Sequence, residues 1–348
     1  MRALVYSDLQ ATDGHEKCHT QPNLSLQLVR VDAFFTLLHE IYVEHKCDCL
    51  WDLGDTTDDR TSIPVPVIDV LCRNLERFPR SDYSVKLIGN HEQYLRNTQV
   101  HVGKLFSPYF NVVESNSVIP VPGKNARILA CSYPSKDHET VQWLESNRKS
   151  SLRTVVLGHL QVVGAVTSSG ELLEGVPKDS LTWADLCLLG HIHKPQSLSA
   201  KTHYVGSPFQ QDWGESQEDK RVGIVDITDN SVKVTWIPIA GFPEYKKVNL
   251  QEFSSLADGV CEDRFKVVIK SVDEASSFYA HPYAHLAEPV YDFDVNNVSS
   301  ESTEVADKWD FSSVMRRYVE KYTPESKGIP VSNEEMVEFG NEISKFVT

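Results

Sequence analysis

Five short segments of the sequence place metal-binding residue types directly after apolar runs. They are Ser7-Asp8-Leu9-Gln10, Gly54-Asp55, Gly89-Asn90-His91, Gly158-His159 and Gly190-His191-Ile192-His193. Oxygen ligands from Asp and Asn suit Mn²⁺ and Mg²⁺, while imidazole suits Mn, Fe and Zn, so the mixture indicates a site for two metal ions. Each segment alone is weak, because an aspartate after a strand is more often a turn residue. Five such segments in order are hard to obtain by chance.

Each segment follows a stretch that the sequence predicts to be a β-strand. These stretches are rich in β-branched and other apolar residues, and they stop at a turn signal. They cover residues 2–7, 48–53, 84–88, 152–157 and 186–189. Because ligands of open α/β sheets bind at the carboxyl ends of the strands, we expect the five segments to meet there.

Two amphipathic helices are predicted between the first strands. Apolar residues recur at a spacing of three to four over residues 28–45, and a proline opens the second helix over residues 64–78. Further strands are expected at 126–132, 202–207, 221–228, 231–239 and 264–271. Alternating strands and helices followed by a strand-rich part predict a layered α/β domain with sheets between helices.

Composition narrows the function classes. The 348 residues are 41% apolar and 24% charged, which is typical of a globular protein, and no apolar run approaches the ~20 residues that cross a bilayer. The first residues lack the features of a signal peptide, and the seven scattered cysteines indicate reduced thiols, so we expect a cytoplasmic protein without a membrane partner. A net charge of −15 argues against a broad nucleic-acid-coating surface. It does not exclude a nuclease, because bound divalent cations can supply the local positive charge.

The last part of the chain differs in amino-acid composition from the rest. Residues 288–310 contain seven Asp or Glu against one Lys and are predicted to be a solvated linker. Two short amphipathic helices are predicted over 311–322 and 332–347, the second opened by a capping box of Ser332 and Glu335. Such a pair is too small to fold alone, so we expect it to dock on this protein or on a partner.

The five segments resemble the motif set of the calcineurin-like metallophosphoesterase superfamily, D-x-H, GD-x-x-D, GNH-D/E, GH and GH-x-H. In this chain Gln10 stands at the position of the first family histidine. More narrowly, the sequence is similar to the SbcD-type DNA nucleases, which work with an SMC-like ATPase in recombination and break processing. Three stretches carry this likeness: GDTTDDRTSIPVP leading into a helix, GNHE, and YVGSPFQQDWGE followed by KRVGIVDI. The length and the helical tail look closest to phage-encoded members.

The resemblance covers residues 1 to about 240 and implies an architecture. It is a four-layer sandwich of two mixed β-sheets flanked by helices, with a small α+β cap and a C-terminal helical segment. The implied domains are a nuclease domain at 1–245, a cap for DNA binding or specificity at 246–298, and the linker with its helices at 299–348. The helices would bind an SbcC-type ATPase, and the compartment would be the host cytoplasm for a phage-encoded protein. Whether the chain forms a homodimer stays open.

The resemblance also implies a ligand set for two divalent ions, with manganese favoured and magnesium as the alternative. Asp55 would bridge both ions. The other implied ligands are Asn90, His159 and His191 for one ion, and Asp8, Gln10 and His193 for the other. An amide oxygen is a weaker ligand than imidazole for softer metals, so Gln10 predicts a more labile second site. The alternative is that Gln10 touches no metal and that water or His15 fills the position.

Catalysis is assigned to His91, which follows the family's catalytic histidine near the scissile phosphate. Asp58 would orient it, with Asp59 as a rival. The implied activity is manganese-dependent, two-metal hydrolysis of DNA, exonucleolytic on duplex ends and in addition endonucleolytic on single strands. Two alternatives stay open: a phosphatase or phosphodiesterase for small molecules or phosphoproteins, and a catalytically weakened scaffold for the ATPase. Retention of the other site residues argues against the scaffold.

Overall fold

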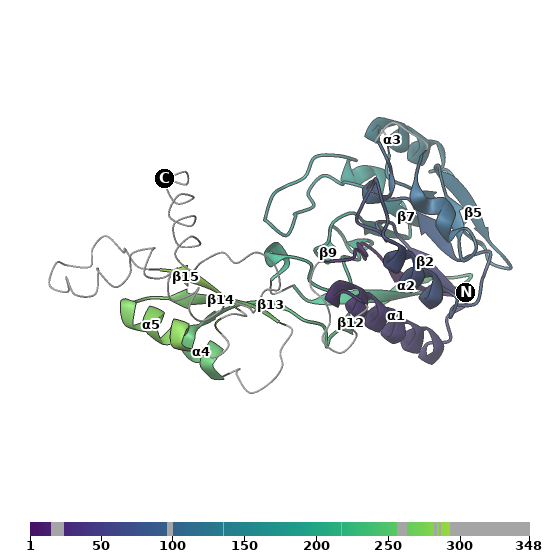
Figure 1. Ribbon diagram of the computed structural model, residues 1–348. Coiled ribbons are helices and arrows are strands. Elements are labelled where there is room, and N and C mark those ends of the chain that lie inside the picture. The colour runs from purple at the N-terminus through teal and green to yellow at the C-terminus, as the bar shows by residue number, and fades with distance from the viewer. Residues whose placement is uncertain are drawn as a thin grey trace. The chain divides into compact units, whose positions relative to one another are not determined.

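Two mixed β-sheets of six strands each are the main elements of the fold (Figure 1). The computed structural model describes residues 1–14, 24–95, 100–134, 136–216, 218–255, 263–281, 284 and 287–292. In spatial order, the first sheet consists of β12 (Val232–Ile239), β11 (Lys220–Ile227), β1 (Arg2–Tyr6), β2 (Cys49–Asp52), β3 (Val85–Leu87) and β4 (Asn111–Val113). The second consists of β5 (Ser117–Val121), β6 (Ala126–Cys131), β7 (Arg153–His159), β8 (Leu186–Gly190), β10 (Thr202–Tyr204) and β9 (Gln196–Ser197).

Each sheet has a parallel centre. Strands β1 to β4 run parallel in the first sheet, and β11 pairs antiparallel with both β1 and β12. In the second sheet β6, β7, β8 and β10 run parallel, and β5 and β9 are antiparallel at the two edges. The carboxyl ends of the parallel strands of one sheet therefore lie at a common edge.

Side-chain alternation along β1 shows how the layers are stacked. Ala3 and Val5 belong to a buried cluster that contains residues of both sheets, such as Trp51 of β2 and Leu157 of β7. Their neighbours Leu4 and Tyr6 point the other way. Successive side chains of a strand point to opposite faces, so β1 is covered on both sides.

Helices α1 (Leu26–Glu44) and α2 (Val65–Leu75) cover the outer face of the first sheet. Ser25 caps α1 by accepting the backbone N–H of Leu28, and Pro64 precedes α2. Phe34 and Phe35 of α1 contact the Tyr6 ring edge-on. Both helices predicted from apolar spacing are present, with ends shifted by a few residues.

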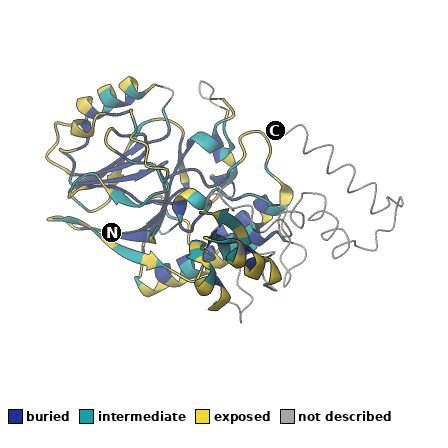
Figure 2. Ribbon diagram, turned by 90° about the vertical axis from the view of Figure 1, so that its left-hand side faces the viewer, coloured by how far each residue is buried: buried dark blue, intermediate teal, exposed yellow. Residues whose placement is uncertain are grey.

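The outer face of the second sheet packs against α3 (Asp137–Ser146). Leu129, Val156 and Leu189 of the sheet share a buried cluster with Leu144 of this helix. The buried strands and the exposed outer faces of the helices are visible in Figure 2. The order is therefore helices, sheet, sheet, helix, and the predicted two-sheet sandwich is confirmed.

The remaining elements are short. Within the described part of the chain, four 3-10 helices lie in loops: η1 (Asn90–Glu92), η2 (Val102–Phe106), η3 (Lys178–Ser180) and η4 (Trp213–Glu215). A third sheet has the order β13 (Tyr245–Asn249), β14 (Arg264–Ile269) and β15 (Ala287–Tyr291), and two helices follow its first two strands, α4 (Leu250–Ser255) and α5 (Val272–Ala280). Among the described residues, no helix combines the length and apolar character needed to cross a membrane.

The chain divides into two compact units. One comprises Met1–Val267 and Ala280–Pro289. The other comprises Val268–Tyr279 and Val290–Thr348, of which residues 268–279 and 290–292 are described. The predicted domain boundaries at 245/246 and 298/299 stay predictions. The predicted helices over 311–322 and 332–347, and the linker from residue 293 onward, lie outside the described residues.

Candidate metal centre

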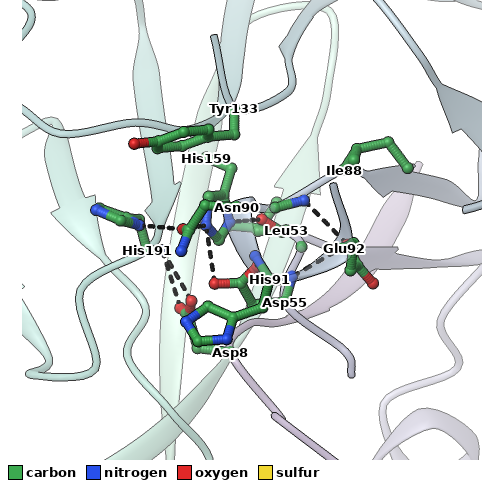
Figure 3. Close-up of polar contacts among 12 residues, drawn as sticks. Asp8, Leu53, Asp55, Ile88, Asn90, His91, Glu92, Tyr133, His159 and His191 are labelled. Atoms are coloured by element: carbon green, nitrogen blue, oxygen red, sulfur yellow. Dashed lines mark hydrogen bonds and ion pairs between the residues drawn. The ribbon is translucent and has the colours of Figure 1, made fainter. Parts of the chain in front are cut away.

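The five predicted segments meet between the two sheets. Asp8, Asp55 and Asn90 follow β1, β2 and β3 of the first sheet. His159 ends β7 and His191 follows β8 of the second. Figure 3 shows the five side chains pointing toward one another. The structure thus brings together residues separated by up to 183 positions in the chain, the separation of Asp8 and His191.

Four of these side chains converge closely. One ligand atom from each of Asp55, His159 and His191 lies within 4.8 Å of the others. The Asn90 Oδ1 atom lies 3.1 Å from His159 Nε2 and 2.6 Å from His191 Nδ1. His159 Nε2 is also 3.3 Å from Asp55 Oδ2. Two oxygens and two ring nitrogens therefore surround one point, which is the donor set expected of a divalent metal site.

The orientation of His159 fits metal binding. Its Nδ1 lies 2.7 Å from the backbone oxygen of Leu53, which can only accept, so Nδ1 carries a proton. Its Nε2 then faces the oxygens of Asn90 and Asp55. The two oxygens and the lone pair of His159 Nε2 repel one another unless a positive charge lies between them. That charge can be a proton or a metal ion. A backbone carbonyl on the far nitrogen is the usual support of a metal-binding histidine.

The electrostatics of the centre favour positive charge. Burial lowers the pKa of His159, but Asp55 and Asp8 raise it to about 9. Burial raises the pKa of Asp55, yet the neighbouring His159 lowers it to about 2, so this carboxylate is ionised. Burial, together with the charge on His159, lowers the pKa of His191 to about 3. His191 is thus a neutral imidazole, the form that binds metal.

The backbone around the centre is strained. Among the described residues, five other than glycine have positive φ, and four of them lie here: Asp8 (53°), Gln10 (45°), Asp55 (53°) and His191 (90°). Hydrogen bonds hold these conformations, since Asp8 N donates to Gly54 O and His191 N donates to Asp8 Oδ1 at 2.9 Å. Strain of this kind concentrates at functional sites, where the surroundings must support it.

Two of the three residues predicted for the second ion, Gln10 and His193, line a neighbouring cavity. Gln10 and His193 share a cavity of about 270 Å³ with Asp58. Gln10 is anchored through its backbone N–H, which donates to Asp55 O at 2.8 Å. His193 Nδ1 lies 2.6 Å from Glu215 Oε1. Ligation by Gln10 stays a prediction, and its alternative, His15, lies outside the described residues.

His91 faces the same region without joining the ligand cluster. Its backbone N–H donates to Asp55 Oδ1 at 2.8 Å, and its ring Nδ1 lies 2.8 Å from Asp58 O and 3.1 Å from Asp58 Oδ1. The hydrogen bond that the His91 ring donates to Asp58 raises the pKa of His91 to about 9, although partial burial opposes it. The ring is therefore protonated near neutral pH. Asp59 instead accepts hydrogen bonds from Thr61 and Ser62, so Asp58 is the residue that contacts His91.

A family model described as calcineurin-like phosphoesterase matches residues 1–195 of the 348. The chain belongs to this family. Its members bind two divalent metal ions, and the cluster of Asp55, His159 and His191 is compatible with such binding. The predicted membership is thereby confirmed, and the phosphoesterase is a metal-dependent hydrolase.

Two curated relatives are named as the SbcD component of the nuclease SbcCD. The protein of Staphylococcus epidermidis is 22% identical over 239 residues, 66% of this chain and 62% of its own length. The protein of Staphylococcus saprophyticus is 24% identical over 143 residues, 39% of this chain and 36% of its own. The phosphoesterase therefore spans less than two thirds of these relatives. Among solved structures, a dimetal phosphatase from Danio rerio is 11% identical with a TM-score of 0.44, covering 68% of this chain and 95% of that one.

Sequence reasoning assigned no role to the buried charges beneath the phosphoesterase site. Glu92 of η1 accepts the backbone N–H groups of Gly89, Asp55 and Thr56 at 2.9–3.2 Å. Lys86 Nζ lies 2.7 Å from Glu92 Oε1 and 3.1 Å from Asp52 Oδ2, and all three side chains are fully buried. This network ties the loops after β2 and β3 together. In the sequence, a lysine within the apolar run of β3 was the one indication of this network.

Proposed function

We propose that this phosphoesterase is a manganese-dependent DNA nuclease that hydrolyses phosphodiesters with two metal ions. The observation that carries the proposal is the convergence of Asp55, Asn90, His159 and His191 beside a protonated His91. The likeness to the SbcD proteins of two SbcCD nucleases supports DNA as the substrate. Manganese is favoured, with magnesium as the alternative, because carboxylate and amide oxygens accompany imidazole in the donor set.

The proposed ligand set is the one that the family resemblance implies. Asp55 is the shared carboxylate. The ligands proposed for the first ion are Asn90, His159 and His191, and those proposed for the second are Asp8, Gln10 and His193. Two bound divalent ions would activate a water and neutralise charge that develops on the phosphate.

His91 and Asp58 are the proposed catalytic pair. Asp58 holds the Nδ1 proton of His91, so the other ring nitrogen, Nε2, is available to donate its proton to the departing oxygen. A positioned acid of this kind contributes about 10²–10⁴-fold to a rate. In this proposal Asp58 sets the ring orientation and maintains its charge.

The proposed partners are DNA and an SMC-like ATPase of the SbcC type. Support comes from the two relatives, whose names include SbcCD, and from the amphipathic pattern predicted over 311–347. The cytoplasm is the proposed location. A chain truncated at residue 305 should keep manganese-dependent cleavage of simple DNA substrates but lose binding to the ATPase. Loss of the circular dichroism signal on truncation would assign the segment to the folded core instead.

The test of function uses purified protein with end-labelled duplex and single-stranded DNA, in Mn²⁺ or Mg²⁺. We expect cleavage that chelation abolishes and that Asp55→Ala removes, with product lengths giving polarity. The net charge of −15 favours a second candidate, hydrolysis of small phosphoesters. Cleavage of a nitrophenyl phosphodiester together with inert DNA would establish that candidate and refute the nuclease.

A further inference from the structure

Glu215 lies almost completely buried in the loop between β10 and β11, within the stretch SPFQQDWGE. Its two carboxylate oxygens have different partners. Oε1 lies 2.6 Å from His193 Nδ1. Oε2 accepts from Ser207 Oγ at 2.9 Å, Gln211 N at 3.3 Å and Lys220 Nζ at 2.6 Å. Three donors on one oxygen therefore leave the other oxygen facing the His193 ring.

This contact fixes the ring of His193. An ionised carboxylate accepts and does not donate, so His193 Nδ1 must carry the proton. In the neutral ring, Nε2 then carries the lone pair with which a histidine binds metal. Carboxylates in this position orient metal-binding histidines and raise their basicity.

The same loop also holds the backbone of the second proposed site. Gln211 Nε2 donates to Asp8 O at 2.8 Å. Ser207 N and Lys220 Nζ donate to His193 O at 3.0 and 3.1 Å. By contrast, His159 of the first proposed site is held by Leu53 O, on a different loop. The contacts that hold the rings of His193 and His159 thus come from different loops.

We propose that Glu215 is a positioning residue for His193, and that Lys220 determines which carboxylate oxygen faces the ring. The inference rests on the proposed metal site and deepens it. With Gln10 in place of an imidazole, the second site depends more heavily on His193 as its nitrogen ligand. Its affinity should therefore respond to Glu215, while the affinity of the first site should not.

Glu215→Gln tests this assignment with almost no change of shape. In the variant, the donors from Lys220, Ser207 and Gln211 retain the amide oxygen, so the amide NH₂ faces His193 Nδ1. That nitrogen must then accept, and the ring proton moves to Nε2, the proposed ligand atom. We expect Mn²⁺ binding at one of two equivalents to weaken about 10–100-fold, the usual effect of losing such a support.

The measurements are calorimetric titration with Mn²⁺ and ring ¹⁵N NMR of the metal-free protein at a pH where its imidazoles are neutral. We expect one histidine to change from the Nδ1–H to the Nε2–H form in Glu215→Gln. Glu218→Gln is the matched control, because Glu218 Oε2 also pairs with Lys220 Nζ, at 2.9 Å, whereas among the described residues no hydrogen bond or ion pair joins Glu218 to His193. It removes the same charge beside the same lysine and should leave both titration steps and the ring signals unchanged.

Four outcomes would overturn the inference. Two binding steps in Glu215→Gln equal to those of the parent would show that Glu215 does not support a ligand. Equal weakening of both steps, or the same change in Glu218→Gln, would show a general effect on the fold. A parent protein that binds no Mn²⁺ would refute the metal centre and the proposed function along with it. Normal binding without DNA cleavage would contradict the nuclease proposal alone.

Discussion

Replacing Asp58 with asparagine removes the negative charge beside His91 but keeps the size and shape of the side chain at position 58. The ring Nδ1 of His91 lies 3.1 Å from the Asp58 carboxylate and 2.8 Å from the Asp58 backbone oxygen. Asparagine keeps the backbone contact and the side-chain volume but loses the negative charge. The proton on His91 should therefore be held less tightly in Asp58→Asn.

The size of the effect follows from the exposure of the pair. The pKa of His91 is about 9 against an ordinary 6.5, with the hydrogen bond to Asp58 as the largest cause and Asp55 as a further one. The two side chains are 31% and 43% exposed, so solvent screening limits the contribution of the Asp58 charge to about 1 kcal/mol, or about 0.7 of a pH unit. Bound divalent cations lower the pKa of His91 in parent and variant alike. The difference between the two proteins is therefore the quantity to measure.

The assay is the pH dependence of kcat/KM at saturating Mn²⁺, with DNA as substrate. His91 acts in its protonated form, so activity falls as pH rises through its pKa, and the alkaline limb should lie about 0.7 of a pH unit lower in Asp58→Asn. A nitrophenyl phosphodiester, whose leaving group departs without protonation, should not show the shift. Asp59→Asn is the matched control, because Asp59 accepts from Thr61 and Ser62 rather than from His91. An unmoved limb in Asp58→Asn, or an equal shift in Asp59→Asn, would refute the role of Asp58.

Four other changes test the centre and its support. Asp55→Ala should abolish Mn²⁺-dependent cleavage and leave fewer than two bound ions in a calorimetric titration; cleavage at the parental rate would contradict the shared-ligand assignment. Mn²⁺ affinity should rise about tenfold per pH unit between pH 7 and about 9, because binding displaces the proton on His159, whose pKa is about 9. A Mn²⁺ affinity that does not change with pH in calorimetry would show that binding displaces no proton from His159. Gln10→His should raise the affinity for the more weakly bound Mn²⁺ and lower the Mn²⁺ concentration needed for half-maximal activity. If the parent binds two ions with equal affinity and the substitution changes neither, residue 10 is not a ligand. Lys86→Met should reduce the free energy of unfolding in urea by about 3–5 kcal/mol, because buried Asp52 and Glu92 lose their counter-charge; a loss under about 1 kcal/mol would contradict that reading.

The sequence predicted the strands that bear the site and the gathering of polar residues at their ends because both depend on local pattern. Apolar runs such as Arg153–His159 end at a ligand-type residue, and parallel pairing brings such ends together. The short strands β4 and β9 were not predicted. Three or two residues carry no periodicity, and their pairing is determined by neighbours distant in the chain.

The supports of the site were harder to predict than the site itself. Glu215 and Lys220 stand in stretches that carry the family resemblance, yet neither spacing nor composition links them to His193, which lies 22 residues from Glu215. Lys86 is similar, since its partners Asp52 and Glu92 lie on two other segments. A charged side chain can be buried only with a partner of opposite charge. When that partner lies on another loop, the sequence does not identify it and the folded structure does.

The division of the centre between two sheets has a mechanical consequence. Asp8 and Asp55 follow strands of the first sheet, and His159 and His191 belong to the second, so a bound ion would act as a staple across the buried layer between them. Separation of the sheets would then require release of the ion. The bound ion would link segments as far apart in the chain as Asp8 and His191. Metal present at 100 times its dissociation constant adds about 2.7 kcal/mol to the folded state. Chelators should therefore accelerate unfolding of the sandwich as well as stop catalysis, and substitutions in the layer between the sheets, at Trp51 or Leu157, should alter metal affinity without touching a ligand.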